Sequence, residues 1–258
     1  VAVRFRDTGV GMSEERRRRA FSSMLSTTKA KGTGLGLAIV ARVVEQHRGQ
    51  GLLPPGAAGS LEARTLAQRW QGLEASLELL GKPQRVVAHW QQWQKPVELR
   101  GTNLVLVHTA KPRARHGLTL WLKLLLARAA GLNPSQGVLV ARGDKGFGPQ
   151  LQLASPSTEA AQAELQRLSA WCHDWQGRCW PVPPQTGWVY AEAEHSKPGS
   201  GLAKAIACWE GALGGAGERE EPEQSLCFGS NLAGVELLDA RVQQLSTELL
   251  SPLLEARR

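Results

Sequence analysis

The stretch GTNLVLV at residues 101–107 decides how the main part of this chain folds. The segment GTN is typical of a tight turn, and the four apolar residues after it are typical of a strand. LTLWLKLLLARAA at residues 118–130 has the apolar spacing of a helix, and GVLVA at residues 137–141 indicates a further strand. Helices mixed with a few strands predict an α/β to α+β fold.

Outward from this stretch the remaining elements follow from the same local rules. A strand is predicted at residues 85–93, and a hairpin at 97–107 with its turn at 101–103. The other predicted elements are helices, at residues 60–80, 157–175, 203–209 and 235–249, and Ser157 is expected to cap the second of them. Pro54 and Pro55 interrupt the chain within a glycine-rich break at residues 49–59. We therefore expect two parts, residues 1–50 and 51–258.

Charge is distributed unevenly along the chain. The net formal charge is +8, and residues 82–128 alone hold nine Lys or Arg against one acid, Glu98. Lys111, Arg113, Arg115 and His116 fall within six residues of this window and are the predicted DNA-binding residues. The lysine and the two arginines could each neutralise a phosphate. Two interpretations remain open from composition: a surface that binds DNA, or a solvated basic turn with no ligand.

Several classes of protein are disfavoured by the sequence. The longest apolar stretch is interrupted by Lys123 and Arg128, so no membrane span is expected. The chain shows no secretion signal, which predicts a cytoplasmic location, and it lacks an initiator Met, so we expect it to begin inside a longer protein. The four cysteines have no CxxC spacing, which predicts reduced thiols and no metal site.

Two glycine-rich loops mark the first 50 residues. Asp7-x-Gly9-x-Gly11 is followed about 20 residues later by Gly32-x-Gly34-x-Gly36, which opens a predicted helix. Closely spaced glycines let the backbone approach a ligand, and a helix N-terminus favours phosphate. An aspartate in such a loop can accept a hydrogen bond from the amino group of adenine. The predicted nucleotide-binding residues are Asp7, Gly9, Gly11, Lys29, Gly32, Gly34 and Gly36.

These motifs resemble those of the GHKL (Bergerat) ATPases, in particular the histidine kinases. Residues 7–12 resemble the first glycine box, residues 26–29 the lid, and residues 32–40 the second glycine box. The resemblance implies ATP with Mg²⁺ as cofactor. The Asn-bearing helix that holds Mg²⁺, the phosphoacceptor-His helix and the closing strands of that family have no counterpart, so we expect weak nucleotide binding at best and no kinase activity.

From residue 51 onward the chain resembles the C-terminal region of the exodeoxyribonuclease V gamma subunit, RecC. The resemblance rests on segments in the same order as in that family: residues 53–59, 101–107, 111–113, 118–125, 181–191, 207–211, 217–220 and 251–254. It implies a PD-(D/E)xK nuclease-like domain that has lost its metal site. It also implies RecB-like and RecD-like partner subunits, and a duplex DNA end or single-stranded DNA as ligand.

The residues agree with the loss of nuclease chemistry. A nuclease of this kind needs an Asp at a strand end and an acid-x-Lys on the next strand, which together hold Mg²⁺. Glu98 is the only acid between Val97 and Lys123. We therefore expect a non-catalytic, DNA-handling part of a RecBCD-type complex in double-strand break repair. The alternative is an ATP-binding fragment of a sensor histidine kinase, and a fused or chimeric chain would explain both resemblances.

Overall fold

The computed structural model describes residues 56–211, 215–229 and 231–258. The chain divides into two compact units, residues 1–74 and 75–258. Helix α3 (Gly56–Glu78) contains the described part of the first unit and the first residues of the second. No helix in the described ranges is long and apolar enough to cross a membrane.

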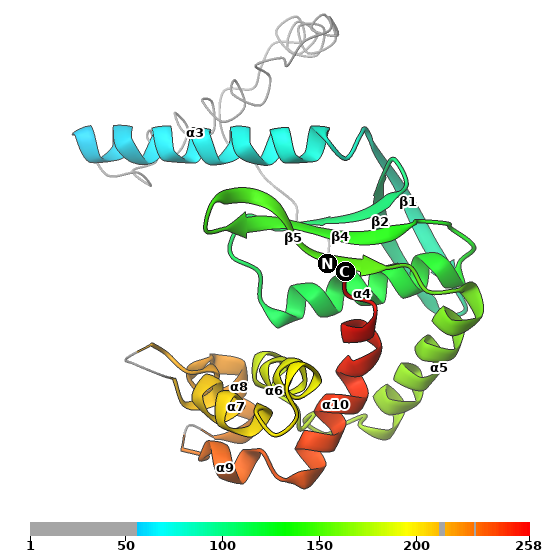
Figure 1. Cartoon of the computed structure of the whole chain (residues 1–258), viewed down its shortest axis with the longest axis vertical. Helices are drawn as coiled ribbons and strands as arrows, with labels where there is room; N and C mark the ends of the chain where they lie inside the picture. The colour runs from blue at the N-terminus through cyan, green and yellow to red at the C-terminus, as the bar shows by residue number, and fades with distance from the viewer. Residues whose placement is uncertain (1–55, 212–214, 230) are drawn as a thin grey trace, which may run out of the picture. The chain divides into compact units, whose positions relative to one another are not determined.

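A five-stranded mixed sheet organises the second unit (Figure 1). Its spatial order is β1 (Pro83–Trp90), β2 (Trp93–Arg100), β3 (Asn103–Val107), β4 (Gln136–Gly143) and β5 (Gly146–Ala154). β3 and β4 are parallel, and the other neighbouring pairs are antiparallel. Parallel neighbours require a crossover, which helix α4 (Ala114–Ala129) provides.

The main core lies between the sheet and α4. Leu120 and Leu124 of α4, Leu104 of β3, Leu139 of β4 and Leu153 of β5 are all fully or almost fully buried. Helix α5 (Thr158–Asp174) packs beside α4. α4 contacts β1, β2, β3 and β4, so one face of the sheet packs against this helix.

The remaining helices form a second cluster that contacts α4 through α6 (Figure 1). They are α6 (Pro184–Ser196), α7 (Gly201–Glu210), the 3-10 turn η1 (Glu218–Glu220), α8 (Pro222–Phe228), α9 (Gly234–Leu237) and α10 (Ala240–Glu255). α10 packs on α6, and its C-terminal end returns to the sheet, where Arg257 bridges to Leu153. The second cluster is therefore linked to α4 through α6 and to the sheet through the residues that follow α10.

The sequence-based predictions hold for most elements. The hairpin at 97–107, the helix at 118–130, the strand at 137–141 and the Ser157 cap are confirmed, the cap by a 3.1 Å bond from the Ala160 N–H. The predicted strand 85–93 is divided by a turn between β1 and β2. The predicted helix 235–249 is also divided, because Asp239 accepts the Val242 N–H at 2.8 Å and starts α10 as a new helix.

Candidate nucleic-acid interface

The four predicted DNA-binding residues lie at the start of α4. Lys111 belongs to the segment between β3 and α4, and Arg113 is the N-cap residue of α4. Arg115 and His116 lie in the first helical turn, so the basic segment is half loop and half helix, where the sequence predicted a loop. The structure therefore brings all four residues to one end of a helix that is anchored in the core.

His116 contributes to helix capping. Its Nδ1 accepts a hydrogen bond from the Arg113 backbone N–H at 2.8 Å, which requires an unprotonated nitrogen. Its ring also stacks on His108, with 3.7 Å between the ring centroids. Burial, with smaller contributions from His108, Arg115 and Arg113, lowers the pKa of His116 below its ordinary 6.5. The imidazole is therefore neutral at pH 7, and the positive charge of the segment comes from Lys111, Arg113 and Arg115.

Two of these three cations face carboxylates. The Lys111 Nζ lies 2.5 Å from Asp144 Oδ1 in the β4–β5 turn, and this hydrogen bond lowers the pKa of Asp144. The Arg113 guanidinium pairs with Glu221, the residue before α8. The exposed side chain of Arg115 has no hydrogen-bond or ion-pair partner within the described ranges. Of the three cations, Arg115 is thus the one without an anionic partner among the described residues.

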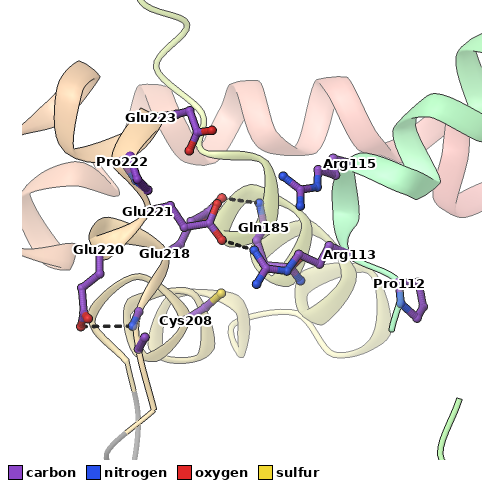
Figure 2. A pocket seen from close by; sticks show the side chains of 12 residues that line it. Pro112, Arg113, Arg115, Gln185, Cys208, Glu218, Glu220, Glu221, Pro222 and Glu223 are labelled. Atoms are coloured by element: carbon purple, nitrogen blue, oxygen red, sulfur yellow. Dashed lines mark hydrogen bonds and ion pairs between the residues drawn. The ribbon is translucent and has the colours of Figure 1, made fainter. Parts of the chain in front are cut away.

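A pocket of about 670 Å³ opens beside this segment, as Figure 2 shows. Arg113 and Arg115 reach toward it from α4, and Glu218, Glu221 and Glu223 face them across it. Further lining residues are Pro112, Gln185, Cys208, Ala216, Gly217, Glu220 and Pro222. The pocket is therefore of mixed charge, with more carboxylates than guanidinium groups.

Glu218 holds this wall of the pocket in place from within the fold. Its side chain is buried, with 6% of the residue exposed, and its two oxygens accept the backbone N–H groups of Gln185 at 2.8 Å and Thr186 at 2.6 Å. The N-cap of α6 is Pro183, whose side chain has no acceptor. Glu218 therefore supplies from η1 the cap that α6 lacks.

Gln185 extends this support to the basic segment. Its side-chain Oε1 accepts the backbone N–H of Ala114, the first residue of α4, at 2.8 Å. One chain of hydrogen bonds thus runs from Glu218 through Gln185 at the start of α6 to Ala114 at the start of α4. Figure 2 shows the first of these bonds, between Glu218 and Gln185. This chain of hydrogen bonds ends at Ala114, between Arg113 and Arg115.

The sequence reasoning missed the acidic residues of this site. It found the basic window at 82–128 but did not pair it with Asp144, Glu218 or Glu221. The available signal was the run of four glutamates within residues 218–223, because opposite charges attract each other where the fold brings them close together. Nothing in the local sequence indicated which basic residues it would meet.

The strands carry little that could hold a metal ion. Glu98 is the only acidic residue of the five strands, and it pairs with Arg100 at 2.7 Å and with Arg85 at 3.7 Å. No group of three or more His, Cys, Asp or Glu side chains in the described residues is arranged to hold a metal. The predicted nucleotide-binding residues between Asp7 and Gly36 lie outside the described residues.

Comparison with known proteins connects this geometry to a family. The model of the RecC C-terminal domain matches residues 17–195, more than half of the chain. The chain belongs to the RecC C-terminal domain family. The RecC match begins inside the predicted first part, residues 1–50, and covers the basic segment of α4.

Short matches to histidine kinases support the other resemblance. The chain is 51% identical over 49 residues to the sensor histidine kinase ZraS of Klebsiella oxytoca, which is 19% of this chain and 10% of that protein. It is 38% identical over 50 residues to sporulation kinase E of Bacillus subtilis (strain 168), which is 19% of this chain and 7% of that protein. The chain thus spans a tenth or less of the length of these kinases.

Proposed function

We propose that residues 51–258 are a non-catalytic domain that contacts DNA and binds the RecB-like and RecD-like subunits of a RecBCD-type complex. The observation that carries the DNA half of this proposal is the cluster of Lys111, Arg113 and Arg115 at the anchored start of α4. Lysine and arginine bind phosphate oxygens irrespective of base sequence. Such contacts suit a protein that handles a duplex DNA end or single-stranded DNA of any sequence. The subunit-binding half rests on the family.

The domain is further proposed to be a nuclease-like fold without a metal site. Its mixed sheet with a helical crossover supports the first part of this proposal. The second part is supported by Glu98, whose carboxylate pairs with Arg85 and Arg100 and stands without a second acid on the strands. A carboxylate held by two guanidinium groups is a poor ligand for Mg²⁺, because the same oxygens are already used.

Replacing Lys111, Arg113 and Arg115 together by Ala tests the DNA contact. We expect binding of a fluorescein-labelled blunt DNA duplex to be lost or to become independent of salt, because the phosphate-binding charges are removed. The measurement is fluorescence anisotropy over a series of KCl concentrations, with the full chain. Base preference should stay unchanged, since phosphate contacts carry no sequence information.

A matched control removes the same amount of charge elsewhere. Arg178, Lys197 and Lys204 are exposed, and replacing all three by Ala should leave the salt dependence close to that of the wild type. Equal losses in the two triple variants would show that only net charge matters. In that case the basic segment is not the DNA contact, and the domain acts through protein subunits alone.

A second candidate function concerns residues 1–50, and the kinase matches favour it. We propose that this segment is a remnant of an ATP-binding lid, with weak affinity for ATP and Mg²⁺, joined to the RecC-like domain in a fused chain. A fluorescent ATP analogue titrated with Mg²⁺ into the full chain should bind weakly or not at all. Sub-micromolar binding that disappears in Asp7→Asn would instead indicate a working nucleotide site.

A further inference from the structure

The acidic partners of the basic segment form ion pairs that are open to solvent. Asp144 and Glu221 come from the β4–β5 turn and from the start of α8, and each meets one cation of the segment. Neither pair is deeply buried: the exposed fractions are 65% for Lys111, 88% for Asp144, 54% for Arg113 and 32% for Glu221. Ion pairs as exposed as these contribute little to folding stability. We expect these ion pairs to affect phosphate binding more than folding stability, because each carboxylate pairs with a cation that a phosphate would otherwise contact.

We propose that Asp144 and Glu221 form an electrostatic latch that competes with DNA phosphates for Lys111 and Arg113. This inference rests on the proposed DNA contact and adds its regulation. With the latch closed, Arg115 is the one cation of the segment available to a phosphate. Binding through all three cations requires DNA phosphates to displace both carboxylates. The latch therefore lowers the affinity for DNA that contacts this segment alone. DNA that is also bound elsewhere in the complex can displace the carboxylates and contact all three cations.

The location of the two acids supports a separable latch. Asp144 lies in the turn between two antiparallel strands, and its side chain has no partner other than Lys111 among the described residues. Glu221 precedes α8 on the far wall of the pocket, and Arg113 is the only side chain it pairs with in that part of the structure. Opening either pair therefore breaks no other hydrogen bond or ion pair of these two side chains within the described residues. Glu218, by contrast, is committed to the α6 backbone and takes no part in the latch.

The latch predicts a specific salt dependence of DNA binding. Each phosphate that a cation neutralises adds about −0.9 to the slope of log affinity against log salt. With Arg115 alone available, the wild-type slope should be about −1. The double variant Asp144→Asn, Glu221→Gln frees Lys111 and Arg113, and its slope should approach about −3. Its affinity at low salt should rise by about twofold to fivefold for each pair released.

The experiment measures anisotropy of the labelled blunt duplex with the full chain, for each single variant and the double variant. Glu223→Gln is the matched control, because Glu223 lines the same pocket and has no ion pair in the described chain. It should leave the slope near the wild-type value. Asp144→Asn changes a side chain that is 88% exposed, so it tests the latch even where Glu221→Gln disturbs the fold.

The outcomes separate the latch from the proposed function. Loss of binding in the Lys111, Arg113, Arg115 triple variant together with an unchanged slope in the double variant would overturn the latch and leave the DNA contact in place. Unchanged binding in the triple variant and in the double variant would overturn both. A slope that steepens equally in Glu223→Gln would show a general charge effect and would also overturn the latch.

Discussion

Replacing Glu218 by Ala should lower the free energy of unfolding by about 2–4 kcal/mol, because it leaves the N–H groups of Gln185 and Thr186 without an acceptor inside the protein. Pro183 offers no substitute cap, so the first turn of α6 loses its only side-chain acceptor. Urea unfolding followed by circular dichroism measures the change. The duplex binding described above should weaken in parallel, since Gln185 links α6 to the start of α4.

Two further variants define what Glu218 contributes. Glu218→Gln keeps one acceptor oxygen but turns an NH₂ group toward the second N–H, and should lose about half as much stability as the Ala variant. Glu223→Ala removes an exposed carboxylate from the same wall and should stay within about 0.5 kcal/mol of the wild type. A Glu218→Ala protein as stable as the Glu223→Ala protein would contradict the capping role.

Replacing Trp209 by Ala is expected to cost about 3–5 kcal/mol of unfolding free energy, the largest effect we predict for a single side chain. Trp209 of α7 is fully buried, its Nε1–H donates to the Leu232 carbonyl at 2.8 Å, and its ring meets the Phe228 ring edge-on at 5.7 Å. Removal leaves a large cavity beside Phe228 and leaves the carbonyl of Leu232, in the segment between α8 and α9, without its donor. The measurement is the midpoint and slope of urea unfolding.

The same position allows packing and hydrogen bonding to be separated. Trp209→Phe retains most of the ring packing and loses the bond to Leu232, so about 1–2 kcal/mol should be lost. Leu226→Ala, on α8 with 88% of the residue exposed, should change stability by less than about 0.5 kcal/mol. If the Trp209→Ala and Leu226→Ala proteins unfolded at the same urea concentration, the prediction that the buried Trp209 side chain stabilises the fold would be wrong.

Local sequence rules predicted the elements that depend on nearby residues. The β2–β3 turn is set by residues 101–103, the central helix by its own apolar spacing, and the start of α5 by Ser157 acting on Ala160. In each case the interaction that forms the element joins residues only a few positions apart, so the local sequence pattern is sufficient to predict it.

The formation of β5 and α6, and the identity of the carboxylates that pair with the basic segment, depend on the tertiary structure and could not be predicted from local sequence. β5 contains Gly148 and Pro149, which disfavour a strand, and it exists because pairing with β4 at the edge of the sheet tolerates a proline. α6 begins after two prolines and is capped by Glu218 from more than 30 positions away. Arg113 and Glu221 are 108 positions apart. Sequence composition determined that positive charge would gather around α4, but only the folded chain decided which carboxylates would meet it, because an ion pair depends on distance in space and the sequence records only order.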